Sequence, residues 1–212
     1  MPRFADLSIS EFLDALSSPN PTPGGGTAAA VCGSIAVALL IMVASLNKTK
    51  TNADVERSAL IDARRALEPI KRRLLELGDA DSTAFDEVMA AYRLPKLNDE
   101  EKARRKHAVQ RSLRAATQVP LDTLRAMTDA IDHAPSVARF GNRAALSDIR
   151  VALELFEASS AGAAANVEIN LTGLEDEAFR KSVAADVLTL TNRVKEHTAN
   201  ARAALVEGAV AG

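Results

Sequence analysis

Asp81 is the carboxylate best placed for chemistry, because on a helix it falls on a face that is otherwise apolar. The other residues of that face are Leu77, Ala84, Phe85 and Val88. A carboxyl group among apolar side chains has a raised pKa, which suits a general base or acid that works near neutral pH. The alternative is an ion pair buried with an Arg or Lys. Asp79 and Asp86 fall on other faces, where we expect both to be solvated.

Two asparagines and an aspartate share one face of a later helical segment. Asn166 and Asn170 are four residues apart. Asp148 precedes Asn166 by five whole turns, or about 27 Å along the helix axis. A single ligand reaches both ends only if it is long, or if two copies of the chain bring opposite ends together. The alternatives are hydrogen bonds between helices for the asparagines and, for Asp148, an interaction with the positive end of its helix.

A glycine-rich loop at 21–26 leads into the uncharged segment 27–46. Three interpretations compete: a membrane span, a nucleotide-binding loop, or a buried helix whose N-terminus faces a ligand. The length suffices for a span, but small residues predominate and no basic cluster flanks the segment. Glycine spacing alone does not indicate a nucleotide, because prolines and no strand precede it. We expect a buried helix whose free N–H groups face a ligand, with a tight turn and Thr27 as N-cap as the alternative.

The composition limits the classes of function. The 212 residues are 47% hydrophobic, which is ample for one core, and the net charge of −2 implies no general affinity for nucleic acid. The single cysteine, Cys32, forms no internal disulfide. The three histidines lack metal-ligand spacing, so we expect no metal site. Because no signal-peptide pattern is visible, we expect a cytoplasmic protein without membrane attachment.

The hydrophobic pattern is helical nearly throughout, with no strand period. Capping boxes at Ser8/Glu11 and Asn98/Glu101 mark helix starts, Asp54 and Asp176 are expected caps, and Pro69 is expected to kink or restart a helix. The expected helices are 8–16, 27–46, 54–92, 98–131, 144–170 and 176–206. The pattern predicts a single all-α domain over residues 1–212, a bundle of long helices around a buried Ala-rich central helix.

The outer face of the 144–170 helix is poor in charge, which favours oligomerisation. The residues expected on that face are Leu153, Phe156, Ala158, Ala161, Gly162, Ala164 and Ala165.

Taken in order over about residues 8–190, several motifs resemble one family, that of formiminotetrahydrofolate cyclodeaminase and methenyltetrahydrofolate cyclohydrolase. The motifs are Pro21-Thr22-Pro23-Gly24-Gly25-Gly26 before an Ala-rich helix, Asp81-x-x-Ala84-Phe85-x-x-Val88, Leu94-Pro95-Lys96, Gly141-Asn142 with Asp148, and Asn166-Val167-x-x-Asn170. The resemblance implies a homodimeric all-α bundle that binds tetrahydrofolate. A long folate ligand and a dimer would also account for the spacing of about 27 Å.

The resemblance implies that Asp81 is the catalytic acid or base and that no cofactor or metal is needed beyond the folate substrate. A cyclodeaminase removes a proton from N10 as this nitrogen attacks the formimino carbon, and then helps ammonia leave. A cyclohydrolase activates water against the methenyl carbon and then protonates N5. The implied substrate-binding residues are Pro23, Gly24, Gly25, Gly26, Lys48, Lys50, Asn142, Asp148, Asn166 and Asn170.

The stretch 47–53 departs from the family pattern. Members often have a segment rich in glycine and lysine, with an aromatic residue, after the apolar helix. Here Lys48 and Lys50 remain, but the glycine and the aromatic residue are absent. If this stretch binds the polyglutamate tail of the substrate by charge, the change affects affinity or specificity. The alternative is two solvated lysines.

We expect no transferase domain on this chain that would generate formiminotetrahydrofolate. This expectation favours a methenyltetrahydrofolate cyclohydrolase, which forms 10-formyltetrahydrofolate. The first alternative is a formiminotetrahydrofolate cyclodeaminase, an ammonia-lyase that forms 5,10-methenyltetrahydrofolate, because a separate chain could supply its substrate. A second alternative, from another class, is a non-catalytic folate-binding or helical dimer protein.

Overall fold

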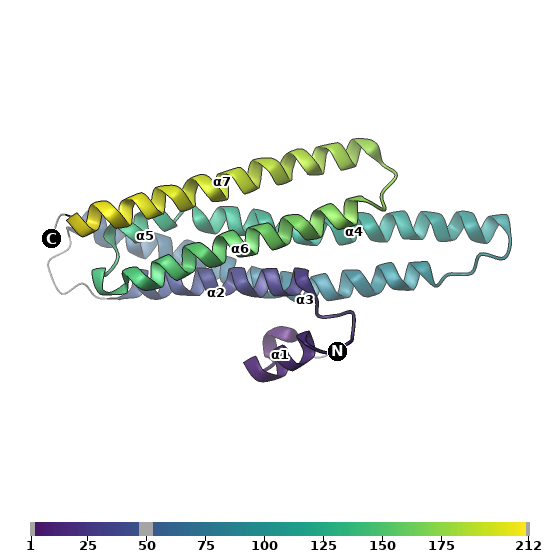
Figure 1. Ribbon diagram of the computed structural model, residues 1–212, viewed down its shortest axis with the longest axis horizontal. Helices are drawn as coiled ribbons and strands as arrows, with labels where there is room; N and C mark the ends of the chain where they lie inside the picture. The colour runs from purple at the N-terminus through teal and green to yellow at the C-terminus, as the bar shows by residue number, and fades with distance from the viewer. Residues whose placement is uncertain (1–2, 47–52, 211–212) are drawn as a thin grey trace.

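The computed structural model describes residues 3–46 and 53–210, which form helices joined by short connections (Figure 1). In chain order these are η1 (Phe4–Asp6), α1 (Ile9–Leu16), α2 (Gly25–Ser45), α3 (Asp54–Tyr92), α4 (Asp99–Ile131), α5 (Ala134–Phe140), η2 (Arg143–Ala145), α6 (Leu146–Leu171) and α7 (Glu177–Val210). The described residues contain no strand, which confirms the all-α prediction. The long helices lie roughly along one axis, and α1 projects from the bundle (Figure 1).

Helix starts follow the capping residues that the sequence predicts. The Ser8 hydroxyl accepts the N–H of Glu11, and the Glu11 carboxylate in turn accepts the Ser8 N–H at 2.8 Å, which completes the capping box. Asn98 Oδ1 accepts the N–H of Glu101 at 2.8 Å. Asp176 caps α7 by accepting a backbone N–H of its first turn. Side chains therefore satisfy donors that would otherwise have no intrahelical partner.

One local prediction is wrong, and one of the two alternatives predicted for Pro69 is excluded. Asp54 is the first helical residue of α3, and Ala53 occupies the N-cap position without a side-chain hydrogen bond. Pro69 neither stops nor restarts α3, which continues from Asp54 to Tyr92. Proline removes one backbone donor, but fully buried leucines on both sides of it keep the helix packed against the bundle.

Small residues let α2 pack closely between α3 and α6. A Cβ atom on Gly33 would lie 2.4 Å from Met127 Sδ of α4, so α2 also touches α4 where glycine has no side chain. Across the α2–α6 contact, the buried Ser159 hydroxyl donates to the Ala29 carbonyl at 2.7 Å. A Cβ atom on Gly162 would lie 3.1 Å from Ala29 Cβ, which is also a tight contact. The abundance of small residues therefore serves helix packing.

One side of α2 is not covered by the rest of the chain. Most of its residues are buried, including Val37 and Leu40, but Ile35 is 50% exposed, and Val31 and Met42 are half-buried. The helix is long and apolar enough to cross a membrane, and 56% of its apolar window is buried inside the bundle. It is thus a core helix on one side and an apolar surface on the other.

The expected outer face of α6 is correct only in part. Leu153 and Phe156 are fully buried in the core, whereas Ala158, Ala161 and Ala165 are exposed. The seven residues span more than one face at 100° per residue, so the larger side chains turn toward the core.

Substitution of two helical glycines by alanine tests the close packing. Neither glycine has a positive φ, so alanine adds no backbone strain and only the space around the new methyl group matters. We expect Gly33→Ala to lower the free energy of unfolding by about 1–3 kcal/mol, because the methyl group would overlap Met127 and Ser159. Gly78→Ala is the matched control: its Cβ would meet only ordinary contacts beyond 3.5 Å, so it should stabilise the helix by about 0.5–1 kcal/mol. Urea denaturation measures both. Equal effects of the two substitutions would contradict this account.

Candidate active site

Asp81 lies where the first turn of α2 packs against α3. A Cβ atom on Gly26 would lie 2.2 Å from Asp81 Oδ1 and 2.6 Å from Oδ2, so the carboxyl group occupies the space of the missing side chain. Gly26 is buried, whereas Asp81 is half-buried. Only glycine permits this close approach of the α2 backbone to Asp81.

The Thr27 hydroxyl lies beneath Asp81 and is fully buried. Its Oγ1 is 3.2 Å from Asp81 Oδ2, 3.1 Å from the Gly78 carbonyl oxygen and 3.1 Å from Ser82 Oγ. The alternative role of Thr27 as N-cap is wrong, because Gly24 is the N-cap residue of α2. Thr27 is the third residue of α2, in its first turn, and its hydroxyl points across to α3 rather than back to its own backbone.

Burial raises the pKa of the Asp81 carboxyl group above its usual value, and hydrogen bonds from the Thr27 side chain and backbone oppose this rise. Removal from water disfavours the ionised carboxylate, whereas donors from the N-terminal turn of α2 favour it. No Arg or Lys is among the causes of the shift. The apolar-face prediction therefore holds, and among the residues that the structure describes no Arg or Lys forms the alternative buried ion pair with Asp81.

The N-terminus of α2 faces α6 as well as α3. Gly25 is exposed, and a Cβ atom on it would lie 3.6 Å from Asn166 Nδ2. The first N–H groups of a helix have no intrahelical partner, and Gly24 offers no side-chain cap for them. Gly25, Asp81 and Asn166 thus surround one helix end that presents backbone donors.

The two asparagines of α6 have different partners. Asn166 Nδ2 donates to the Gly162 carbonyl at 2.8 Å, one turn back on its own helix. This bond uses one of the donors of an amide side chain that also has an acceptor oxygen. Asn170 Nδ2 donates to the Ala116 carbonyl of α4 at 3.0 Å. Asn170 therefore has the interhelical role that was the alternative, while Asn166 lies beside the end of α2.

Asn142 and Asp148 lie at the other end of the bundle from Asp81. A Cβ atom on Gly141 would lie 2.7 Å from Val43 Cγ1, and Val43 is about 27 Å along α2 from Gly25. Asn142 caps η2 by accepting the Ala144 N–H, and Asp148 is in the first turn of α6. A single copy of the chain therefore does not bring these two residues to Asp81.

The remaining predicted ligand-binding residues lie around the α2 entrance or outside the described residues. Pro23 is buried and Gly24 half-buried, directly before α2, and the Thr22–Pro23 peptide bond is cis. Lys48 and Lys50 fall outside the residues that the structure describes.

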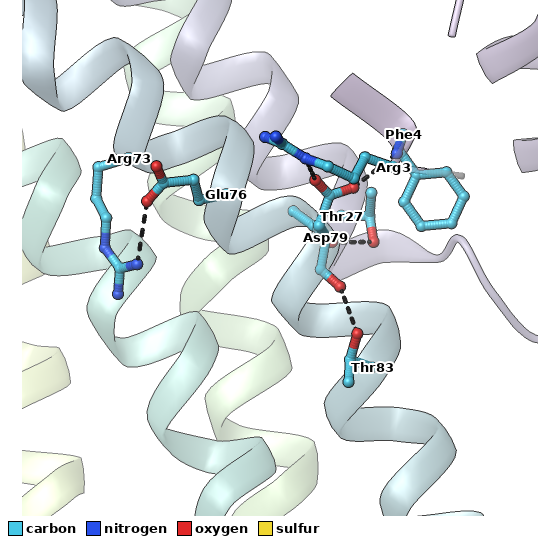
Figure 2. A network of polar contacts seen from close by, with 8 residues as sticks. Arg3, Phe4, Thr27, Arg73, Glu76, Asp79 and Thr83 are labelled. Atoms are coloured by element: carbon cyan, nitrogen blue, oxygen red, sulfur yellow. Dashed lines mark hydrogen bonds and ion pairs between the residues drawn. The ribbon is translucent and has the colours of Figure 1, made fainter. Parts of the chain in front are cut away.

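Asp79 is not solvated as expected. Its carboxylate accepts the Phe4 backbone N–H at 2.6 Å and pairs with the Arg3 guanidinium at 3.2 Å (Figure 2). These contacts hold the N-terminal segment against α3, two residues before Asp81. Asp86 is exposed, as expected.

Two cavities border the helices that carry Asp81 and Asn166. One, of about 420 Å³, is bordered by Arg3, Asp79, Ser82 and Asp86, next to Asp81 on α3. A larger one of about 600 Å³ lies between α6 and α7. Its α6 residues are about half a turn around the helix from Asn166, so the larger cavity is separate from the Asp81 arrangement.

Comparison with known proteins identifies the family. The family model of formiminotransferase-cyclodeaminase matches residues 8–189. The chain belongs to the formiminotransferase-cyclodeaminase family. The resemblance inferred from the ordered motifs is thereby confirmed, and the match covers most of the range over which those motifs occur.

Members of the formiminotransferase-cyclodeaminase family resemble this chain to different extents. It is 42% identical over 172 residues to the methenyltetrahydrofolate cyclohydrolase of Methylorubrum extorquens, covering 81% of this chain and 83% of that protein. It is 32% identical over 191 residues to the formimidoyltransferase-cyclodeaminase of Gallus gallus, of which it spans 35%. The crystal structure of formiminotetrahydrofolate cyclodeaminase from Thermotoga maritima superimposes with a TM-score of 0.85 at 31% identity, covering 97% of this chain and 98% of that one.

The raised pKa of Asp81 leads us to expect that the stability of the fold depends on pH. The pKa of the Asp81 carboxyl group is raised in the folded state, so its protonated form favours folding at low pH. This contribution to stability is lost as the pH rises from the pKa of the unfolded state through the pKa of the folded state. Asp81→Asn should therefore be more stable than the parent above the folded pKa, and the difference should vanish below about pH 3.5. Thermal unfolding from pH 3 to pH 8 measures this.

Asp62→Asn is the matched control for this comparison, because Asp62 is exposed on the same helix. It should change stability little at any pH. If the parent instead became more stable than Asp81→Asn as the pH rises, the assignment of a desolvated carboxyl group would be contradicted.

Proposed function

We propose that this chain is a methenyltetrahydrofolate cyclohydrolase in which Asp81 is the general base and acid. The observation that carries the proposal is the half-buried Asp81 carboxyl group held against Gly26, beside Asn166 and the end of α2. The 42% identity with the Methylorubrum cyclohydrolase favours hydrolysis over deamination. The cyclodeaminases compared with this chain are 31–32% identical to it.

The proposed reaction needs one carboxyl group that both accepts and returns a proton. Water attacks the methenyl carbon, its oxygen bonds to that carbon, and the Asp81 carboxylate takes one water proton. The bond from this carbon to N5 then breaks, and the protonated Asp81 gives its proton to N5. The carbon stays on N10 as a formyl group, and the second water proton is released to solvent, which balances the loss of the methenyl positive charge.

The electrostatics of Asp81 suit both halves of this sequence. Burial holds the carboxyl pKa above its usual value, so the group is a stronger base than an exposed aspartate. Its negative charge also lies where it would attract the cationic methenyl group of the substrate. Asn166 and the free N–H groups near Gly25 supply donors for the polar atoms of a bound folate.

Formiminotetrahydrofolate cyclodeaminase activity is the second candidate. The observation that favours it is the likeness to the Thermotoga maritima cyclodeaminase over nearly the full length of both chains. In that reaction Asp81 would take the N10 proton as N10 bonds to the formimino carbon. The formimino group enters the reaction protonated, as an amidinium, and Asp81 would then give the N10 proton to its amino nitrogen, so that this nitrogen leaves as neutral ammonia and the positive charge remains on the methenyl product. The same carboxyl group thus serves either reaction.

We also propose that the chain works as a homodimer. The uncovered side of α2 is apolar and centred on Ile35, the midpoint of the helix. A two-fold axis near Ile35 would place one copy's Gly25 end against the other copy's Val43 end. Asn142 and Asp148 of one copy would then lie near Asp81 and Asn166 of the other, which explains their separation within one chain.

Three further expectations belong to this proposal. Lys48 and Lys50 would bind the carboxylates of a polyglutamylated substrate. Folate would be the only small molecule required, with no further cofactor. The enzyme would act in the cytoplasm. The cyclohydrolase chemistry written above uses only groups of this chain and water.

The first functional prediction concerns Asp81→Asn. An amide cannot accept the water proton, so we expect the turnover of methenyltetrahydrofolate to fall by about 10²–10⁴-fold. The measurement is the loss of methenyl absorbance, run beside ammonia release from the formimino compound. The parent enzyme should be faster in the first assay, and faster ammonia release would assign the second candidate instead.

Asp62→Asn controls for the loss of a carboxylate from α3 and should keep parental turnover. Full activity of Asp81→Asn would reject the assignment of the catalytic group. A parent protein inactive in both assays, but stabilised against heat by tetrahydrofolate, would be a non-catalytic binding protein.

The second functional prediction tests the shared site by mixing inactive variants. In a mixture of Asp81→Asn with Asp148→Asn, each hybrid dimer would contain one intact site. Refolding or subunit exchange at equal amounts should restore about a quarter of the parental activity. The matched control mixes Asp81→Asn with Asn166→Ala, which damage the same half of the site and should restore nothing. Equal recovery in both mixtures, or none in either, would argue against a site shared between copies.

A further inference from the structure

The buried Thr27 hydroxyl has three hydrogen-bond partners, and its single hydrogen cannot be donated to all of them at once. A hydroxyl group has one donor hydrogen and two acceptor lone pairs. Gly78 offers only a carbonyl acceptor, Ser82 can donate or accept, and Asp81 does either according to its protonation state. The Thr27 hydrogen therefore points to the Asp81 carboxylate or to the Gly78 carbonyl, but not to both.

Each protonation state of Asp81 selects one arrangement. With Asp81 ionised, Thr27 donates to Oδ2 and accepts from Ser82. With Asp81 protonated on Oδ2, the carboxyl O–H donates to Thr27 Oγ1, and the Thr27 hydrogen turns to the Gly78 carbonyl oxygen at 3.1 Å. Thr27 Oγ1 then uses both lone pairs, for Ser82 and for Asp81. In both states the contacts require no movement of the helices.

We propose that Thr27 is a positioning residue whose hydroxyl group reorients with the protonation state of Asp81. The carboxyl group thereby keeps one position while it acts first as base and then as acid. This inference rests on the proposed function, because it gives Asp81 both roles. The hydroxyl is fully buried, and water does not replace it as the partner of the carboxyl group on this side.

The site around Thr27 supports this role on independent grounds. Asp81 cannot retreat toward α2, because the Gly26 backbone lies directly against its carboxyl group. Gly78 is one turn before Asp81 on α3, so its carbonyl keeps a fixed position relative to the carboxyl group. The carbonyl has a second lone pair for Thr27 besides the one used in the helix.

The test compares Thr27→Ser and Thr27→Cys, which place an oxygen or a sulfur at the same position. Serine keeps a full donor and acceptor, whereas the thiol is a weak donor and a weak acceptor. Without a good donor the ionised carboxylate is less favoured, so the pKa of Asp81 rises. For Thr27→Cys we expect the acid limb of the kcat/KM profile to move up by about one pH unit, with a lower kcat. Thr27→Ser should keep the parental pH profile.

Thr198→Val is the control for the loss of a buried hydroxyl group. Thr198 is also fully buried, but among the described residues its hydroxyl group bonds to the Val194 carbonyl of its own helix and to no other helix. It should leave the pH profile unchanged. Thr27→Val should shift the acid limb at least as far as Thr27→Cys. If the valine variant does not fold, the serine and cysteine pair still decides the matter.

A folded Thr27→Cys with the parental pH profile and kcat would overturn the positioning role. Full activity of Asp81→Asn would instead overturn the proposed function, so the two failures are distinguishable. A shift of the profile in Thr27→Ser equal to that in Thr27→Cys would show that the methyl group matters rather than the hydroxyl group, and would also overturn the inference.

Discussion

The close approach of the first turn of α2 to α3 is the contact on which the rest of the arrangement depends. It exists because Gly26 has no side chain, and the Asp81 carboxyl group takes up the space. The same approach brings the Thr27 hydroxyl under Asp81 and the exposed end of α2 next to Asn166. Any side chain at position 26 would separate the carboxyl group from the donors that oppose its desolvation.

The small residues that continue along α2 explain how an apolar helix of spanning length forms the core of a bundle. Gly33 and Ala29 let neighbouring helices come near enough for hydroxyl groups to reach backbone carbonyls, as Ser159 does. Such contacts satisfy buried polar groups at close range. Hydropathy counts only the apolar character of the segment, whereas the packing depends on side-chain volume, and this is why three interpretations of the segment competed.

Features that depend on neighbours in the sequence could be predicted, and those that depend on packing between distant segments could not. The capping box at Ser8/Glu11, the N-cap role of Asn98 and the apolar face of Asp81 follow from short-range sequence patterns, and the structure confirms them. The box predicted at Asn98/Glu101 is only half formed, because the Glu101 carboxylate accepts the Leu97 N–H instead of the Asn98 N–H. The contacts of Thr27, for which the sequence offered only an N-cap role as an alternative, could not be predicted because its partners, Gly78 and Ser82, are about fifty residues away. Asp79 was misjudged for the same reason, because the N-terminal segment that covers it is remote in sequence.

The length of α2 decides how the remaining polar residues can be used. The helix is about 30 Å long, so Asp81 and Asn142 lie at opposite ends and a single copy cannot join them. In an isologous dimer, each end of α2 lies beside the opposite end of the partner's α2. The proposed dimer therefore needs only one apolar face, centred on Ile35, to build two identical sites. The same length also limits how the two α2 helices can be aligned. A shift of one turn, about 5.4 Å, would move Asp148 of one copy away from the Asp81 carboxyl group of the other. The uncovered apolar side of α2 would then set the geometry of catalysis although its residues are not among those proposed to bind the substrate.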